Sequence, residues 1–273
     1  MSSADRRPFR GGFGALTMGL KPIYYLPMAS LYMVATPIGN LGDMTLRALE
    51  VLREVDSIAC EDTRHSLKLL SHFEIRKPLL SCHANDEARG VSRIVSLLDE
   101  GKNVAYISDA GSPGLSDPGA GAVRAAREAG HTVVPIPGAS AFSSLVSVSG
   151  MPGRSILFEG FLSPKPGRRR ARLVELMARP ESFVVYESPF RIGKLLADIA
   201  AIDPDRRLCL GREMTKIHEE IIAGKASALL ERFGVEGRGE FAVIVGYREH
   251  GVTDSTVGYR EHGVTDSEEE VGE

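Results

Sequence analysis

The sequence has no tryptophan and only three cysteines, Cys60, Cys82 and Cys209, which lie far apart along the chain. An odd number of widely spaced cysteines argues against a secreted disulfide framework, and no two of them have the spacing of a zinc site. Cys60 and Cys82 each end a short apolar run, which is typical of a buried thiol. We therefore expect a cytoplasmic protein with structural cysteines and no metal site.

Long apolar runs are also missing. The nearest candidate, Gly14 to Tyr32, is interrupted by Lys21 and two prolines, whereas a membrane-spanning helix needs about 18–20 apolar residues. The arginines near the start are not followed by the clean apolar stretch of a signal peptide. The sequence therefore predicts no membrane segment, and residues 1–30 are expected to form a disordered N-terminal extension.

An excess of positive charge is absent as well, because the formal net charge is −3. Recognition of nucleic acid depends on a local basic surface rather than on average charge, and one basic cluster opens a predicted helix after the turn SPKPG. It consists of Lys165, Arg168, Arg169, Arg170 and Arg172. A solvated helix start and a phosphate-contacting patch both explain this cluster, and the two interpretations stay open.

What the sequence does contain is a regular alternation of short apolar runs with amphipathic stretches. The predicted strands are LYMVAT, SIAC, LLSC, NVAYIS and TVVPI in a first series, and SILFEGF, SFVVYES, RLCLG and EFAVIVGY in a second. This alternation is typical of α/β proteins with mainly parallel sheets and helices on both faces. Prolines and glycines cluster between Pro137 and Gly153, so we expect two α/β domains, residues 31–138 and 139–247.

The end of the chain repeats itself. VGYREHGVTDS occupies residues 245–255 and recurs unchanged at 257–267, before a run of glutamates. Two copies are too few for a solenoid, which needs at least three stacked units. Residues 248–273 are therefore expected to form a disordered, duplicated tail.

The common nucleotide-binding fingerprints are missing, since the sequence has neither G-x-G-x-x-G after a strand nor the P-loop pattern G-x-x-x-x-G-K-[ST]. In open parallel sheets, however, ligands bind at the carboxyl ends of strands. Three predicted loops at such ends are rich in glycine, proline and small polar residues, and the middle one is far longer than a turn requires. They span Thr36 to Asp43, Ser108 to Gly119 and Pro135 to Ala141.

Two acidic strings also follow predicted strands, EDTRH at Glu61 to His65 and YESPFR at Tyr186 to Arg191. Carboxylates at strand ends can accept a proton from a ligand, although a structural ion pair with a helix cap is the commoner role of such a string. Because each string ends a strand in a different predicted domain, both are expected to face one cleft.

Together these strings resemble a known family. The sequence is similar to the RsmI-type bacterial 16S ribosomal RNA (cytidine-2′-O)-methyltransferases of the tetrapyrrole methylase superfamily. The motifs that carry the resemblance are YMVATPIGNLGD, SIACEDTRH, SDAGSPGLSDPG, VVPIPGASA, FEGFLSPKPGRRR, VVYESPFR, REMTK and RGEFAVIV, in that order. They cover about residues 31–245. Relatives usually continue into a small helical region, which the duplicated tail replaces here; if that region grips the ribosomal substrate, this chain binds it less well.

The resemblance implies the class III methyltransferase fold, in which two α/β domains hold S-adenosylmethionine in the cleft between them, usually in a homodimer. It implies methylation of a cytidine ribose 2′-hydroxyl in the decoding region of 16S rRNA, within the small ribosomal subunit. The cofactor-binding residues carried over from the family motifs are Thr36, Pro37, Ile38, Gly39, Asn40, Asp109, Ala110, Gly111, Ser112, Pro113, Pro137, Gly138, Ser140, Ala141 and Tyr186. The candidate catalytic residues, on the substrate side, are Glu61, Asp62, Arg64 and Glu187.

Methyl transfer to an alcohol is an in-line displacement, for which the enzyme holds the hydroxyl about 3 Å from the methyl group and removes its proton. Glu61, Asp62, Glu187 and Lys216 are all chemically able to be the base. We hypothesise that the EDTR string supplies it, because the string follows a first-domain strand near the cofactor loops. Full methylation by an Asp62→Asn variant that still binds cofactor would contradict this assignment.

Two other functions stay open. Methylation of a tetrapyrrole or another small molecule is the nearer one, but such relatives generally begin with a valine-rich strand followed by G-x-G-P-G-D, where this sequence has TPIGNLGD. The other is a non-catalytic cofactor-binding scaffold on the ribosome, against which the intact acidic strings argue. A nucleotide oxidoreductase is disfavoured because the dinucleotide fingerprint is missing.

Overall fold

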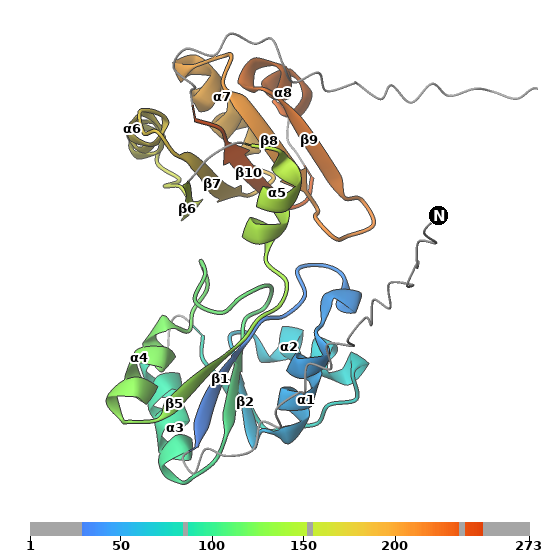
Figure 1. Ribbon diagram of the computed structural model, residues 1–273, viewed down its shortest axis with the longest axis vertical. Helices are drawn as coiled ribbons and strands as arrows, with labels where there is room; N and C mark the ends of the chain where they lie inside the picture. Colours follow the sequence, from blue (N-terminus) through green and yellow to red (C-terminus); the bar gives the residue numbers. More distant parts are fainter. Residues whose placement is uncertain (1–28, 84–86, 152–154, 235–237, 248–273) are drawn as a thin grey trace, which may run out of the picture.

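The computed structural model describes residues 29–83, 87–151, 155–234 and 238–247, whose strands form two five-stranded sheets, one from each half of the chain (Figure 1). The predicted N-terminal extension lies outside the described residues except at its end, where Ser30 begins the first strand. The predicted duplicated tail lies wholly outside them.

The first sheet is parallel throughout and has the strand order β3-β2-β4-β1-β5. Its strands are β1 (Ser30–Val34), β2 (Ser57–Cys60), β3 (Leu79–Ser81), β4 (Val104–Ile107) and β5 (Thr132–Ile136). Both β2 and β4 are buried at every position, as expected for inner strands of a sheet covered on both faces. The parallel α/β arrangement predicted for this half is therefore confirmed.

Helices cover both faces of the first sheet (Figure 1). On one face lie α1 (Leu46–Glu54) and α2 (Thr63–His72), and on the other lie α3 (Glu87–Asp99) and α4 (Ala120–Glu128). Successive side chains of a strand point to opposite faces. Within β4, for example, Ala105 and Ile107 pack with α1, whereas Val104 and Tyr106 pack with α3.

The second sheet is mixed and has the strand order β6-β7-β10-β8-β9. Its strands are β6 (Ile156–Phe161), β7 (Ser182–Glu187), β8 (Arg207–Arg212), β9 (Glu220–Lys225) and β10 (Phe241–Val245). Here β6 and β7 run parallel, but β10 is antiparallel to both β7 and β8, and β8 is antiparallel to β9. The prediction of mainly parallel sheets thus describes the first sheet and not this one.

Two elements of the second half were not predicted, β9 and the helix α8 (Ala226–Phe233) that directly follows it. β9 is an edge strand with alternating half-buried and exposed residues, and its two adjacent isoleucines are too short an apolar run to stand out in the sequence. Because β9 returns beside β8 without an intervening helix, the two strands pair in opposite directions.

Helices also cover both faces of the second sheet. Three of them, α6 (Pro166–Met177), α7 (Ile192–Ile202) and α8, pack on one face, and α5 (Ala141–Ser149) packs on the other. α5 lies on the side toward the first half of the chain (Figure 1). It contacts β8 and β10, so the proposed boundary between residues 138 and 139 assigns it to the second domain. Among the described helices, none is long and apolar enough to cross a membrane.

Candidate functional site

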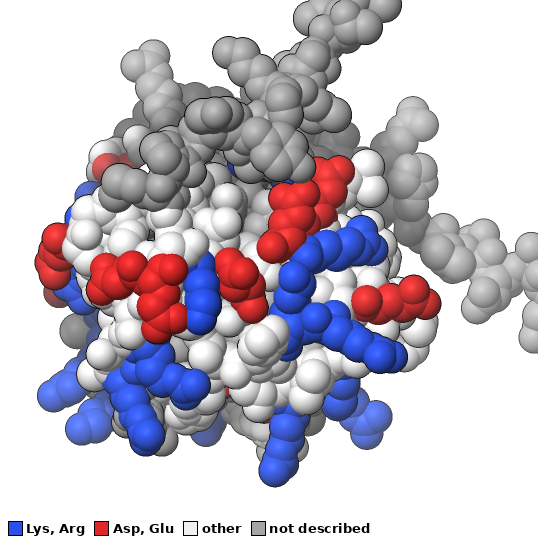
Figure 2. All heavy atoms as spheres, turned by 90° about the horizontal axis from the view of Figure 1, so that it is seen from below, with Lys and Arg blue, Asp and Glu red and all other residues white. Residues whose placement is uncertain are grey.

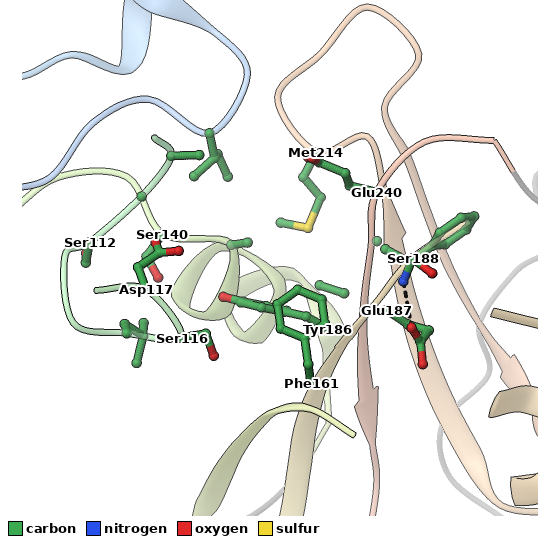
Figure 3. A pocket seen from close by; sticks show the side chains of 18 of the residues that line it. Ser112, Ser116, Asp117, Ser140, Phe161, Tyr186, Glu187, Ser188, Met214 and Glu240 are labelled. Atoms are coloured by element: carbon green, nitrogen blue, oxygen red, sulfur yellow. Dashed lines mark hydrogen bonds between the residues drawn. The ribbon is translucent and has the colours of Figure 1, made fainter. Parts of the chain in front are cut away.

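A pocket of about 440 Å³ lies between the two sheets and takes its walls from both halves of the chain (Figure 3). Its volume falls within the range of about 300–1,000 Å³ that is usual for small-molecule sites. The residues that line it come from loops after strands of the first sheet, from the start of α5, and from one edge of the second sheet. A ligand in this pocket would therefore contact both halves at once.

The first half contributes the loops that follow β1 and β4, which are fastened to each other. The backbone N–H of Thr36 donates to the carbonyl of Gly111 at 2.9 Å, and the N–H of Gly111 donates back at 3.0 Å. The Thr36 hydroxyl donates to the Ser108 carbonyl at 3.0 Å, and the Ser108 hydroxyl donates to the Gly111 carbonyl at 2.9 Å. These bonds fix the backbone of residues 110–112, which forms part of the pocket wall.

α5 directs its N-terminus at the pocket. Ser140, its N-cap residue, makes no side-chain capping hydrogen bond, and both Ser140 and Ala141 line the pocket. The first N–H groups of a helix lack intrahelical acceptors and carry partial positive charge, so this end suits a carboxylate of a ligand. Gly138 allows the preceding chain to pass close to β1, because a Cβ there would lie 3.0 Å from the Cβ of Ala35.

The second half contributes the ends of β6, β7 and β8 and the beginning of β10, which meet at one edge because β10 runs in the opposite direction. Phe161, Tyr186, Gly211 and Phe241 line the pocket from these positions. The rings of Phe158 and Phe161 pack edge-on against Tyr186, with centroids 5.1 and 5.7 Å away. This wall is therefore mostly aromatic and apolar.

The residues predicted to bind cofactor come together in space, although not all of them face the pocket. Ile38, Ala110, Gly111, Ser112, Ser140, Ala141 and Tyr186 line it. Thr36, Pro37, Gly39, Asn40, Asp109, Pro113, Pro137 and Gly138 lie in the same loops outside that lining. Asn40, for instance, caps a short 3-10 helix (Leu41–Asp43), its amide oxygen accepting from the Gly42 N–H at 2.9 Å. Cofactor contact by each of these residues stays a prediction.

Gly39 has a different role in this geometry, because it lies where the loop after β1 meets the loop after β8. A Cβ on Gly39 would stand 2.5 Å from Cγ of Lys216 and 3.0 Å from Oγ1 of Thr215. In the second loop Glu213 and Thr215 have φ values of 48° and 66°, a conformation that costs energy for residues other than glycine. The two halves therefore approach each other closely beside the pocket.

The predicted catalytic string EDTR lies beside the pocket. None of its three candidate residues, Glu61, Asp62 and Arg64, is among the residues that line it. The Asp62 carboxylate caps α2, accepting from the backbone N–H groups of Arg64 at 2.7 Å and His65 at 3.4 Å. These hydrogen bonds hold the pKa of Asp62 below its ordinary value. A carboxylate whose charged form is stabilised in this way is a poor proton acceptor, so the structure favours the capping role for Asp62.

Glu187 is among the residues that line the pocket, but its side chain belongs to the opposite face of β7. Tyr186 packs on the α5 side and Val185 on the side of α6 to α8, and strand alternation places Glu187 with Val185. Its buried Oε1 accepts from the Ser188 N–H and from Nε of Arg191, each at 2.7 Å. The structure thus favours Glu187 as an anchor for the start of α7.

Lys216 is held in a similar way. Its ammonium group makes ion pairs with Glu213 and Glu240, each at 2.9 Å. Partial burial pulls the pKa of Lys216 down, but the hydrogen bonds to these two carboxylates outweigh burial and leave the pKa raised. A lysine that keeps its proton more firmly than usual does not serve as a base.

Two carboxylates of the pocket lining, Asp117 and Glu240, were not singled out by the sequence, and of these Glu240 is bound to Lys216. Asp117 is half-buried and lines the pocket, and within the described residues it makes no hydrogen bond or ion pair. Burial, followed by the negative charges of Glu61 and Asp109, raises the pKa of Asp117 to about 6. The loop that carries it was predicted to be functional, but the resemblance assigned its first part, up to Pro113, and not the SDPG segment that follows.

Comparison with known proteins gives this arrangement a family. Residues 30–230 match the family described as Tetrapyrrole (Corrin/Porphyrin) Methylases. The chain belongs to the tetrapyrrole methylase family. A methylase requires a methyl donor, so a site for such a molecule is expected in this fold.

Within the tetrapyrrole methylase family, the chain is similar to proteins named ribosomal RNA small subunit methyltransferase I. It is 45% identical to the one from Borrelia garinii subsp. bavariensis, over 79% of this chain and 97% of that protein. It is 46% identical to the one from Xylella fastidiosa, over 79% and 81%, and 44% identical to the one from Thermotoga maritima, over 81% and 100%. These identities place the chain in the group of methylases that carries this name.

Solved methylase structures support the fold. A uroporphyrin-III-C-methyltransferase from Thermus thermophilus matches with a TM-score of 0.56 and 21% identity, over 80% of this chain and 94% of that one. The cobalt precorrin-4 methyltransferase CbiF matches with a TM-score of 0.58 and 16% identity, over the same shares. At these identities the likeness concerns the fold alone.

The basic cluster of this methylase is largely used within the protein. Arg169 and Arg170 both bind Asp198, and Arg172 binds Glu159 and Glu175. Arg169 is 3% exposed, so it is part of the interior rather than of a solvated helix start. Figure 2 shows the first half from below, where acidic side chains lie between the basic ones on the described part of that face. Because Arg169, Arg170 and Arg172 are bound to carboxylates, phosphate contact by the basic cluster on α6 has less support than the sequence suggested.

Proposed function

We propose that this protein transfers a methyl group from S-adenosylmethionine to the ribose 2′-hydroxyl of a cytidine in the decoding region of 16S rRNA. The support comes from membership of a methylase family, from relatives of about 45% identity whose names specify ribosomal RNA of the small subunit, and from the motifs that resemble RsmI-type enzymes. The single structural observation behind it is the pocket between the two halves, where the predicted cofactor loops converge.

The residues of the pocket fit S-adenosylmethionine in size and in chemistry. A cavity of about 440 Å³ accommodates a nucleoside with an amino-acid side arm. Backbone groups of Ala110 to Ser112 can hold polar edges of the ligand, Ile38 and Met214 offer apolar contact, and the N-terminus of α5 suits the carboxylate. When bound, the molecule supplies an electrophilic methyl group.

The chain's own task is to orient the ribose hydroxyl, exclude water and accept the proton that leaves the hydroxyl oxygen. The aromatic rings around Tyr186 form an apolar wall on one side of the pocket, and the two halves meet beside the pocket at Gly39. Proteins that recognise RNA in a sequence-specific way mostly bind single-stranded segments. Such a segment can present a ribose to a pocket.

We also propose that the protein works as a homodimer. Several large apolar side chains are left in water by the single chain, including Ile217 (97% exposed), Leu46 (79%) and Val148 (57%). Burial of such residues between subunits would lower their hydration cost. Sedimentation equilibrium measures the mass in solution, and a monomer at micromolar concentration would contradict this proposal.

The proposed reaction is tested with methyl-labelled S-adenosylmethionine and small ribosomal subunits from cells that lack this modification. We expect label in 2′-O-methylcytidine after digestion of the 16S rRNA to nucleosides, and no label with subunits that already carry the modification. Naked 16S rRNA and a precorrin-like tetrapyrrole are the matched alternative substrates. Methylation of the tetrapyrrole with no label in RNA would overturn the proposal, and cofactor binding without turnover on any of them would favour a scaffold.

A further inference from the structure

The pocket contains one carboxylate that faces both halves of the molecule. Asp117 extends from the loop between β4 and α4, and Figure 3 shows its carboxyl group beside Ser140, on the side toward which the hydroxyl of Tyr186 points. Burial raises the pKa of Tyr186 and the charge of Asp117 raises it further, against the lowering effect of a hydrogen bond with the Phe142 backbone. Asp117 and Tyr186 therefore border the same part of the pocket from opposite domains.

The loop that carries Asp117 is held in an unusual conformation. Ser116 has a φ of 62°, in the left-handed region that non-glycine residues rarely adopt, and Gly119 has a φ of 128°. The N–H of Gly114 donates to the carbonyl of Pro118 at 3.1 Å across the turn. Strain of this kind persists where surrounding contacts enforce it, and it occurs preferentially at functional sites.

A contact from the second half fixes this conformation. Gly160 lies at the irregularity of β6, and a Cβ there would stand 2.5 Å from the hydroxyl oxygen of Ser116. The absence of a side chain at Gly160 lets the strand pass close to the loop, immediately before Asp117. The next residue of the strand, Phe161, lines the pocket and is 58% exposed. Asp117 is thus placed by both domains, as a group that must meet a substrate would be.

We propose that Asp117 is the general base of the methyl transfer. In this step the ribose oxygen forms a bond to the methyl carbon while the carbon–sulfur bond breaks, and the electron pair of that bond stays on sulfur as a neutral thioether. The proton of the hydroxyl passes to a carboxylate oxygen of Asp117 and is later released to water. This inference rests on the proposed function, because it assumes an alcohol as acceptor.

The electrostatics of the site suit this role. Burial and the charges of Glu61 and Asp109 raise the pKa of Asp117 to about 6, and Tyr186 faces it from the second half. A base is most effective when its pKa lies close to the working pH, because it is then both ionised and able to hold a proton. At neutral pH Asp117 satisfies both conditions, unlike Asp62, whose pKa is lowered.

The test compares Asp117→Asn with Glu128→Gln, a carboxylate-to-amide change at an exposed position near the end of the helix that follows the loop. Single-turnover methylation of small subunits is measured from pH 5 to 8, and binding of S-adenosylmethionine by calorimetry. We expect Asp117→Asn to slow the reaction by roughly 10²–10⁴-fold with cofactor affinity changed less than threefold. The wild-type and Glu128→Gln rates are expected to rise through about pH 6, and the residual Asn rate to lose this dependence.

A second readout needs neither cofactor nor RNA. Carbon NMR of the aspartate carboxyl groups is expected to show one resonance that titrates near pH 6 and disappears in Asp117→Asn. If Asp117→Asn keeps a third or more of the wild-type rate, or if its residual rate keeps the rise near pH 6, the assignment is wrong while the proposed function stands. If wild-type protein labels no RNA, the proposed function fails and the assignment falls with it.

Discussion

The two sheets reach the same pocket by different constructions. In the first sheet every strand runs parallel, so the loops after β1, β4 and β5 arrive at one edge as a consequence of topology alone. In the second sheet the antiparallel strand β10 lies between β7 and β8, and the pocket edge combines the ends of β7 and β8 with the start of β10. The parallel half therefore presents loop backbone fastened by hydrogen bonds, whereas the mixed half presents strand ends.

The two halves also differ in how their acidic side chains are paired. In the second half the buried or half-buried carboxylates of Glu159, Glu187 and Asp198 are each bound by arginine. In the first half Glu61 and Asp117 stand close enough to repel each other, and Asp117 has no hydrogen bond or ion pair among the described residues. A paired acid stabilises a fold, while an unpaired one costs stability and gains reactivity. This difference favours a structural role for the arginine-bound acids of the second half, and it is consistent with the proton-transfer role proposed above for Asp117.

The largest effect on stability is expected where pairing is most complete. Asp198→Ala leaves the buried Arg169 without its partner, and we expect the free energy of unfolding to fall by about 3–5 kcal/mol. Urea denaturation measures it. The matched control is Glu175→Ala, since Glu175 pairs with Arg172 at the surface and its side chain is 63% exposed, so its removal should cost less than about 1 kcal/mol. Equal losses in the two variants would contradict the distinction.

A smaller effect is expected from Glu187→Gln. The amide keeps the shape of the side chain but loses the charge that holds Arg191, so stability should fall by about 1–3 kcal/mol. Methylation per folded molecule should stay within about tenfold of wild type, which is far less than the loss expected for a base. A loss of 10²-fold or more in single-turnover rate, with the protein fully folded, would contradict this prediction and support a catalytic role for Glu187.

The smallest effect should have the opposite sign. Because the folded state raises the pKa of Asp117 from 3.8 to about 6, its contribution to stability is present below pH 4 and is lost as the pH rises through 6. Asp117→Asn should therefore be more stable than wild type at pH 8, by about 1 kcal/mol after allowance for solvent screening, and nearly equal to it at pH 4. Denaturation of both proteins at the two pH values checks this prediction. A stability advantage of the variant over wild type that is larger at pH 4 than at pH 8 would contradict it.

The loops of the pocket could be predicted from sequence because their backbone geometry leaves a trace in composition. Gly111, Gly114 and Gly119 all have positive φ, and these glycines make the stretch SDAGSPGLSDPG recognisable as a loop in the sequence. The strands of the first sheet were predictable for a related reason, since inner parallel strands such as β2 and β4 are apolar throughout.

The remainder depends on contacts between distant residues, which a single sequence does not display. The place of β10 between β7 and β8 and its antiparallel direction are set by its strand partners, and no residue pattern within FAVIV encodes either. Asp117 becomes a pocket residue because Ser116 packs against Gly160, in the other half of the chain. Conversely, Glu187 looked reactive at a strand end, but Arg191 and the alternation of β7 turn its side chain away.

The polypeptide crosses from one sheet to the other once within its described course, between the end of β5 and the start of α5. A ligand in the pocket would form a second, reversible link between two domains that are joined by one segment of the chain. Part of its binding free energy would then hold the halves in register, as happens for any ligand that binds an assembled state and not a separated one. A bound ligand would thus stabilise the assembled arrangement of the two domains. The ligand-bound protein should resist proteolytic cleavage at residues 137–140 better than the ligand-free protein.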